Sequence, residues 1–454
     1  MSAGFQKPAA LQELAARCIF PSFPGDSPPD WIRRFLAGGG GGIVLFAYNV
    51  PSRDRLSGLC AALRAERGDV LLAIDEEGGD VTRLEWQTGS SYPGGAALGA
   101  VDDVELTQSV ASSIAAELAA AGVNWNLAPV ADVNVPANPV IGTRAFGSDA
   151  ALVARHVAAY VRGTQERGVA ACAKHFPGHG ATEQDSHLEL PVVTGDVEAG
   201  LAPFRAAIAA GVRTIMTAHV LVPALDDAPA TLSAAIVNGL LRDGLGFDGV
   251  VLADALEMKA VSETVGIEES AVQALNAGVD ALCVGHDLGE TAVERILAAL
   301  ADRVPEERLQ EAAGRIDELA TWARPIAGGV DRAAGRDAAR RALRIEGDLS
   351  FAAEPVVVEL RPRANIAAGE AEHSLAAIVV REGEPVPAAD VFVVRDAHRH
   401  PWMRQAADAP GVVVVETGLP VWQPRRSRGY IATNGGSRAS LDAARELLAP
   451  GVTA

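Results

Sequence analysis

The segment VELTQSVASSIAAELAAAG at residues 104–122, followed by NWNLAPV at residues 124–130, indicates the fold class most clearly. In the first segment apolar residues recur three and four positions apart, which is typical of an amphipathic helix. The second segment is short and apolar at most positions, which is typical of a strand buried on both faces. A helix that leads into such a strand is the repeating unit of a parallel sheet with crossover helices.

The same unit recurs through residues 1–324. A count of eight strand-like runs, alternating with helical segments, favours a closed barrel over an open sheet. The sequence therefore predicts an α/β fold with a (β/α)8 TIM-type barrel over these residues. The runs are CIFPSF from Cys18, GIVLF from Gly42, VLLAID from Val70, NWNLAPV from Asn124, VAACAKH from Val169, TIMTAH from Thr214, GVVLAD from Gly249 and ALCVG from Ala281.

A different pattern begins after Arg324. Residues 325–350 are rich in arginine and predict a helical linker. From about residue 355 short strand-like runs return, separated by helix-like or Pro-rich pieces, and they predict a small C-terminal α/β domain over residues 351–454. These runs are VVVEL, SLAAIVV, VFVVRD, VVVVET and YIATN.

Composition limits the partners of the chain. The formal net charge is -19, whereas nucleic acids and anionic membranes bind basic surfaces. No signal peptide, membrane span or phosphate-binding glycine motif is visible, so we expect a cytoplasmic protein without a cofactor. The cysteines are far apart and lie mostly in apolar runs, so we expect buried thiols at Cys18, Cys60, Cys172 and Cys283.

Polar residues stand at the carboxyl ends of four predicted strands. In a (β/α)8 barrel these ends meet at one mouth, so residues distant in sequence can surround one ligand. A lone polar residue that caps its strand is the alternative for each of them, but several in one register favour a site. The residues are Asp75, Lys174, His175, His219 and Asp254.

The segment KHFPGHGATEQDSH at residues 174–187 holds the densest group of titratable side chains. Pro177 and Gly178 exclude a helix there and predict irregular backbone, on which enzymes tend to carry catalytic groups. The Asp185 carboxylate can accept a hydrogen bond from one imidazole nitrogen of His187, which leaves the other nitrogen for proton transfer. A structural Asp–His pair is the alternative interpretation.

Asp254 stands between a predicted strand and the next helix. An ionised carboxylate at this point can attack an anomeric carbon and form a covalent glycosyl ester. A helix N-cap is the alternative, and Glu257 is compatible with it. Asp75, Arg83 and Arg144 are candidates to bind hydroxyl and amide groups, with surface salt bridges as the alternative for the two arginines.

Metal-dependent hydrolysis is another possible chemistry. The spacing of His175 and His179 imitates the HExxH zinc motif, but no Glu follows the first His and Pro177 breaks the helix that the motif requires. We therefore expect no metal, and a metal-dependent barrel hydrolase is the less favoured class. Its candidate ligands would be His175, His179, His187, His219 and Asp254.

The sequence KHFPGHG, followed by four residues and DSH, resembles the signature of family 3 glycoside hydrolases of the bacterial β-N-acetylglucosaminidase branch. The resemblance covers roughly residues 15–290 and implies a (β/α)8 barrel, in agreement with the strand count. The further motifs, in that family's order, are DEEGGDVTRL, NWNLAPVADVN, NPVIGTRAFG, MTAHVLVPALD with PATLS, and GVVLADALEMKAV.

This resemblance implies roles for individual residues. Asp254 matches the nucleophile of a retaining enzyme, His187 matches the acid/base, and Asp185 matches its partner. The implied substrate is a carbohydrate, commonly a muropeptide or related fragment handled in cytoplasmic peptidoglycan recycling. Terminal N-acetylglucosamine would be held by Asp75, Arg83, Arg144, Lys174 and His175.

The chain departs from the family pattern in two places. Glu76 and Asp80 replace the Gln and Arg of DQEGGRVxR, and the C-terminal region is shorter than in two-domain relatives, which weakens the case for its contribution to the active site. A neutral histidine as acid/base does not repel an incoming anion, so phosphorolysis is an alternative to hydrolysis. A broader β-glucosidase is a further alternative. We also expect Asp185 and His187 to reach the scissile bond only when substrate is bound.

Overall fold

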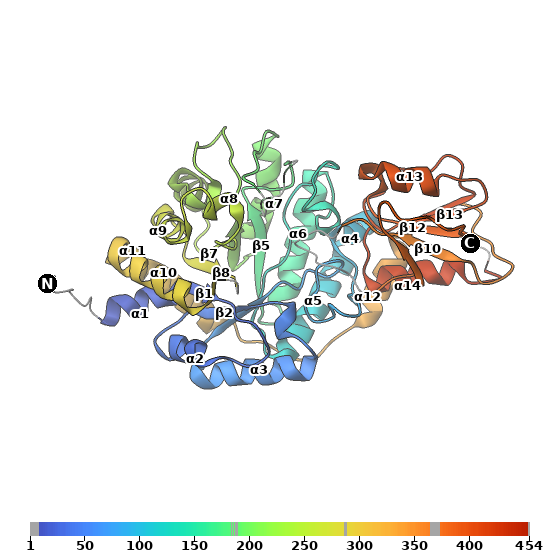
Figure 1. Cartoon of the computed structure of the whole chain (residues 1–454). Coiled ribbons are helices and arrows are strands. Elements are labelled where there is room, and N and C mark those ends of the chain that lie inside the picture. The colour runs from blue at the N-terminus through green and yellow to red at the C-terminus, as the bar shows by residue number, and fades with distance from the viewer. Residues whose placement is uncertain are drawn as a thin grey trace.

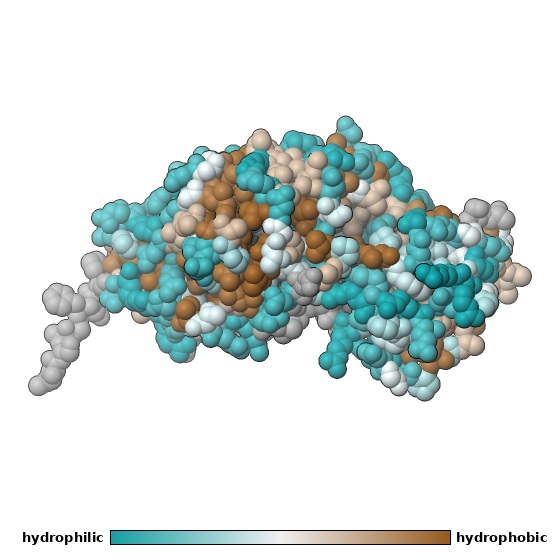
Figure 2. Space-filling view, turned by 90° about the horizontal axis from the view of Figure 1, so that it is seen from above, coloured by the Kyte–Doolittle hydropathy of each residue, from teal (hydrophilic) through white to brown (hydrophobic). Residues whose placement is uncertain are grey.

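The computed structural model describes residues 9–182, 184, 186, 189–285, 288–363 and 373–452. The predicted residues Asp185 and His187 lie outside the described residues. The chain forms a larger N-terminal barrel with a smaller C-terminal domain beside it (Figure 1). Their surfaces differ as well: seen from above, apolar residues gather over the barrel, whereas polar residues cover most of the C-terminal domain (Figure 2).

Eight parallel strands form the barrel, and each predicted run coincides with one of them, with β5 extending one residue past its run, which confirms the predicted fold. The order is β1-β8-β7-β6-β5-β4-β3-β2. The barrel is nearly closed, because β1 and β2 at the two ends of this order also lie next to each other. The strands are β1 (Ile19–Pro21), β2 (Gly42–Leu45), β3 (Leu71–Ile74), β4 (Trp125–Asn126), β5 (Ala170–Phe176), β6 (Thr214–Thr217), β7 (Val250–Ala253) and β8 (Ala281–Val284).

Helices surround the barrel, as the apolar spacing predicts. In α5 (Val104–Ala121) the side chain of Asp103 accepts a hydrogen bond from the Leu106 N–H at 3.0 Å, and Gly122 ends the helix with φ of 89°. Among the described residues no helix combines the length and the apolar character that crossing a membrane requires. The other barrel helices are α1 (Ala9–Arg17), α2 (Asp30–Ala37), α3 (Arg53–Glu66), α4 (Gly95–Val101), α6 (Ala150–Gln165), α7 (Val197–Ala209), the π-helix η4 (Ala235–Gly244), α8 (Lys259–Ser262), α9 (Ile267–Ala277), α10 (Gly289–Arg303) and α11 (Glu306–Trp322).

The inside of the barrel is filled by side chains, and α11 closes one end of it. Phe20 and Trp125 meet edge to face inside, with ring centroids 5.4 Å apart. Ile316 and Leu319 of α11 pack against this interior cluster. The guanidinium of Arg213, which precedes β6, lies 4.7 Å from the Trp322 ring. Since α11 therefore covers the amino ends of the strands, the carboxyl ends are the open mouth.

The C-terminal domain is a six-stranded sheet between two helices. Its order is β11-β10-β12-β13-β14-β9, and all pairs are parallel except β14 with β9. Side chains of α13 pack on one face of the sheet and side chains of α14 on the other. The elements are α12 (Arg332–Arg341), β9 (Arg344–Gly347), β10 (Val357–Leu360), β11 (Ile378–Val380), β12 (Val391–Val394), α13 (Pro401–Ala407), β13 (Val413–Glu416), β14 (Gly429–Ala432) and α14 (Arg438–Leu448).

The predicted helical linker needs a correction. Residues 325–350 are helical only over α12, and β9 is the antiparallel edge strand of the second sheet. All four residues of β9 are exposed, so this strand carries no apolar pattern that a sequence could display. The domain limits at residues 324 and 350 otherwise stay a prediction.

Candidate active site

Four of the five predicted sugar-binding residues lie together at the mouth. Lys174, in β5, places its Nζ atom 2.5 Å from Asp75 Oδ1 and 2.7 Å from Glu77 Oε1. Arg144 binds Glu77 through two parallel hydrogen bonds of 2.9 and 2.8 Å. The Nη2 atom of Arg83 is 3.9 Å from Asp75 Oδ2. The strand ends therefore bring together side chains that are up to 99 positions apart.

Glu77 is the centre of this cluster. Its burial alone would raise the pKa of the carboxyl, but the adjacent charges of Arg144 and Lys174 lower that pKa well below its usual range. The pKa values of Arg144 and Lys174 are raised in turn, against the effect of their own burial. All three groups therefore stay charged, and two cations are held in fixed positions beside Asp75.

His175 is oriented by a residue that the sequence did not single out. Its Nδ1 atom lies 2.8 Å from Oδ2 of the fully buried Asp132, and Asp132 Oδ1 accepts the backbone N–H of His179 at 2.6 Å. Asp132 follows the short strand β4, where the chain continues alongside β5 through a parallel bridge between Val130 and Lys174. The signal was present, because Asp132 ends an apolar run as Asp75 and Asp254 do.

Asp254 follows β7 and does not cap the next helix. Its Oδ1 atom accepts the N–H of Ala255 at 2.8 Å, whereas α8 begins at Lys259 with Met258 at the N-cap position and no capping side chain. Glu257 does not cap either: it accepts the N–H of Gly285, beyond β8, at 2.9 Å. The N-cap interpretation of Asp254 is therefore wrong.

The charge of Asp254 affects the pKa values of the same buried thiols as the charges of Asp75 and Lys174. Burial, together with the charges of Asp75 and Asp254, raises the pKa of the Cys172 thiol to about 12, although Lys174 opposes the shift. Burial and the charges of Glu257, Asp254 and Asp75 raise the pKa of Cys283 as well. The charge of the predicted nucleophile thus acts on the same two buried thiols as the charges of Asp75 and Lys174. The cysteine prediction is also confirmed, because all four thiols are buried and free.

The loop after β5 is anchored by His179. Both ring nitrogens are in hydrogen bonds, Nε2 with Ser186 Oγ at 2.9 Å and Nδ1 with Thr182 Oγ1 at 3.0 Å. Burial lowers the pKa of His179 to about 4, so the ring is neutral at physiological pH. The Nδ2 atom of Asn138 donates to the carbonyls of His179 and Gly180 at 2.9 and 3.3 Å.

Among the remaining candidate metal ligands, His187 lies outside the described residues and His219 is also used within the protein. His219 lies beside Asp254, with Nε2 3.0 Å from the Ala255 carbonyl and Nδ1 2.9 Å from Thr231 Oγ1. Within the part of the chain that the structure describes, no three or more His, Cys, Asp or Glu side chains form a group suited to a metal ion.

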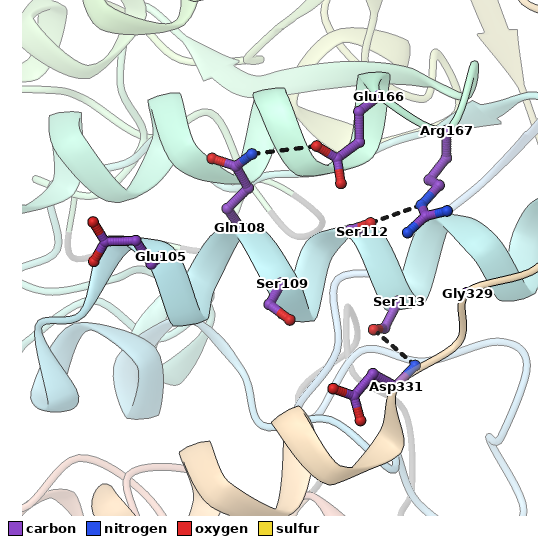
Figure 3. Close-up of a pocket in the computed structure, with 9 residues that line it drawn as sticks. All are labelled: Glu105, Gln108, Ser109, Ser112, Ser113, Glu166, Arg167, Gly329 and Asp331. Atoms are coloured by element: carbon purple, nitrogen blue, oxygen red, sulfur yellow. Dashed lines mark hydrogen bonds between the residues drawn. The ribbon is translucent and has the colours of Figure 1, made fainter.

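A separate polar cavity of about 370 Å³ lies on the outside of the barrel between α5, the end of α6 and residues 329–331 (Figure 3). Its polar groups bind one another: Gln108 donates to Glu166 and Arg167 donates to Ser112. The Asp331 N–H donates to Ser113. The described residues that line it include no predicted site residue. These hydrogen bonds join α5 to the end of α6 and to the segment that leads into α12.

A barrel whose open mouth gathers carboxylates and fixed cations has the form of a hydrolase for a polar substrate. The model of the glycosyl hydrolase family 3 N terminal domain matches residues 32–319, which is more than half of the chain. The chain therefore belongs to glycosyl hydrolase family 3.

Relatives and solved structures agree with this assignment. A β-hexosaminidase of Bordetella avium (strain 197N) is 39% identical over 269 residues, which are 56% of this chain and 77% of the relative. A β-hexosaminidase of Pseudomonas aeruginosa (strain LESB58) is 38% identical over 286 residues, covering 61% and 84%. The structure of NagZ from Neisseria gonorrhoeae in complex with N-trifluoroacetyl-D-glucosamine is 30% identical, with a TM-score of 0.60 over 69% of this chain and 91% of the other.

The C-terminal domain is included in several of the structural matches. A family 3 β-N-acetylglucosaminidase from Paenibacillus sp. str. FPU-7 has a TM-score of 0.84 at 31% identity, over 96% of both chains. Relative to this enzyme the C-terminal region is not shortened, which corrects the expectation from the sequence.

Proposed function

We propose that the protein is a retaining exo-β-N-acetylglucosaminidase that removes terminal β-linked N-acetylglucosamine from muropeptides or other amino-sugar glycosides. The observation that carries this proposal is the half-buried carboxylate of Asp254 directly after β7, at the same end of the barrel as the Lys174 and Asp75 pair and with an effect on the same buried thiol, Cys172. The names of the relatives, β-hexosaminidase and β-N-acetylglucosaminidase, support the choice of sugar. A location in the cytoplasm stays a prediction.

In this proposal Asp254 is the nucleophile. One of its oxygens bonds to C1 of the sugar while the bond from C1 to the leaving oxygen breaks, and the leaving oxygen takes a proton from His187. Water then attacks C1, gives its proton to His187, and the ester to Asp254 breaks. The participation of His187 and Asp185 rests on the sequence alone, through their residue types and the family resemblance.

The cluster around Glu77 would hold the sugar. The Asp75 carboxylate can accept hydrogen bonds from sugar hydroxyls, while Lys174, Arg144 and Arg83 can donate to hydroxyl and acetamido oxygens. His175 would add its Nε2 atom. Because Glu77 keeps two of the cations charged and fixed, these donors need little rearrangement when the substrate binds.

Product analysis tests this function. Incubation with 4-nitrophenyl β-N-acetylglucosaminide should release N-acetylglucosamine that proton NMR first detects as the β-anomer, as a double displacement requires. First appearance of the α-anomer would contradict a retaining mechanism. In phosphate buffer, accumulation of the sugar 1-phosphate would instead identify phosphorolysis, and a faster reaction of 4-nitrophenyl β-glucoside would identify a β-glucosidase.

The role of His187 has its own test. His187→Ala should slow substrates with poor leaving groups far more than activated aryl glycosides, because an activated leaving group needs little protonation. Comparison of kcat/KM for the 4-nitrophenyl glycoside and for a disaccharide checks this. Equal losses on both substrates would mean that His187 is structural.

A further inference from the structure

The C-terminal domain touches the barrel at a loop of the candidate site. Arg395 follows β12 directly, and its Nη1 atom donates to Asp80 Oδ1 at 2.8 Å. The N–H of Gly436, beyond β14, donates to the same oxygen at 3.0 Å. The second oxygen of Asp80 accepts a hydrogen bond from Thr143 Oγ1 at 2.7 Å. The Asp80 side chain is 8% exposed, so three donors from three segments enclose one buried carboxylate.

Asp80 is linked to the sugar-binding cluster through two short pieces of backbone. It shares a tight turn with Glu77, in which the Glu77 N–H donates to the Val81 carbonyl at 3.0 Å and Gly78 has a φ of 79°. On its other side, Thr143 immediately precedes Arg144. Asp80 thus holds together the two segments whose side chains, Glu77 and Arg144, form the bidentate pair at the mouth.

The contact of Arg395 with Asp80, here called the Arg395–Asp80 joint, matters because Asp80 is charged. Its charge makes the turn around Asp80 dependent on the C-terminal domain. Burial would raise the pKa of Asp80, but the adjacent guanidinium of Arg395 lowers it, so the carboxylate is ionised. When a buried ionised carboxylate loses its cation, the folded structure around the carboxylate is strongly destabilised. Asp80 stands where the related motif has Arg, so this chain has an acid where the resemblance predicts a base, and the cation is supplied by the other domain.

We propose that Arg395 is a positioning residue of the sugar site, acting through Asp80 on Glu77 and Arg144. The inference rests on the proposed function, because it assumes that Arg144 binds the sugar. A second contact lies beside it: Arg399 Nη1 donates to the Asn138 carbonyl at 3.2 Å, and the Asn138 side chain holds the loop after β5. The C-terminal domain therefore supports two loops of the mouth.

Kinetics with matched variants test the proposal. Arg395→Ala should raise KM for 4-nitrophenyl β-N-acetylglucosaminide about tenfold and leave kcat within about threefold, because the sugar contacts are displaced while Asp254 is not. Arg395→Lys should recover part of the loss. The double variant Arg395→Ala, Asp80→Asn should be no worse than Arg395→Ala alone, since the unpaired charge is gone. The control is Arg340→Ala, which breaks the exposed Arg340–Glu446 pair and should change neither constant.

Hydrogen exchange of the full chain supplies a readout that does not depend on activity. Arg395→Ala should speed amide exchange in residues 77–83 and 140–145 relative to the wild type and to Arg340→Ala, with the strands of the barrel unchanged. An unchanged KM together with unchanged exchange would overturn the proposal, as would a uniform loss of protection over the whole chain. A wild type without glycosidase activity would instead refute the proposed function, while exchange would still report on the Arg395–Asp80 joint.

Discussion

Two buried carboxylates in this barrel are each surrounded by cations, yet they stand at opposite ends of it. Glu77, at the carboxyl ends of the strands, binds Lys174 and Arg144. Asp280, just before β8, is fully buried and binds Arg242, Arg308 and Arg315. The charge pairing is alike, so it cannot by itself separate a functional cluster from a structural one.

The difference lies in what surrounds each carboxylate. The cations of Asp280 come from helices that flank the amino ends, and the carboxylate also accepts the Val251 N–H at 2.9 Å, so the group ties helices to the closed end of the barrel. The cations of Glu77 lie beside Asp75, which is partly exposed at the open mouth, and Asp254 follows β7 at the same end of the barrel. Position in the barrel, and access to a ligand, distinguish the two clusters.

The largest effect is expected at the mouth itself. Asp254→Ala should lower kcat about 10³-fold or more, because the covalent route is lost, and should leave the unfolding midpoint nearly unchanged. Steady-state kinetics and thermal unfolding check both parts. A variant that keeps most of its rate would remove Asp254 from the mechanism.

At the closed end the effect should fall on stability. Asp280→Asn should lower the free energy of unfolding by about 3–5 kcal/mol, because three arginines lose their buried counter-charge. Urea unfolding measures this, and KM of the folded variant should match the wild type. A raised KM with unchanged stability would mean that Asp280 supports substrate binding and not the closed end of the barrel.

Glu77→Gln is the counterpart at the mouth. We expect kcat/KM to fall about 100-fold, because Lys174 and Arg144 lose the charge that fixes them beside Asp75. Glu76→Gln is the matched control, since it alters the neighbouring carboxylate without touching either cation. Equal losses in both variants would show that this loop responds to any change of charge.

Glu76→Gln should itself change stability in a pH-dependent way. Burial raises the pKa of Glu76 to about 7, although the backbone N–H groups of Arg83 and Leu84 oppose the shift. The folded state therefore resists ionisation, and the wild type loses stability as pH rises from about 4.5 to 7. The glutamine carbonyl can accept the same two hydrogen bonds, so the variant should gain up to about 3 kcal/mol at pH 8 and much less at pH 5. Urea unfolding at the two pH values checks this, and a gain that does not depend on pH would contradict it.

The sequence was sufficient to predict the barrel, because strands that are buried on both faces appear in it as continuous apolar runs. Each of the eight runs coincides with one barrel strand to within one residue at its carboxyl end or contains it. The sequence was insufficient to predict β9, because its residues are exposed at a sheet edge and form no such apolar run.

For the site, the sequence predicted residues that stand at the ends of strands. It missed the residues whose side chains hold these predicted residues in position. Asp75, Lys174 and Asp254 follow or end apolar runs. Glu77 becomes important only through Lys174 and Arg144, which are 97 and 67 positions away in the printed sequence. The joint of Asp80 with Arg395 spans 315 positions, and a separation of this kind leaves no local pattern.

We propose above all that Asp254 at the mouth forms the bond to the sugar. Incubation with a fluorinated 2-acetamido-2-deoxy-glycoside, chosen so that the glycosyl ester forms faster than it breaks, should trap that ester for peptide mapping by mass spectrometry. We expect a mass increase of one N-acetylglucosaminyl group, or its fluorinated form, on the peptide that contains Asp254, and no label in Asp254→Ala. A label on another carboxylate, such as Asp75 or Glu77, or turnover without any label, would contradict it.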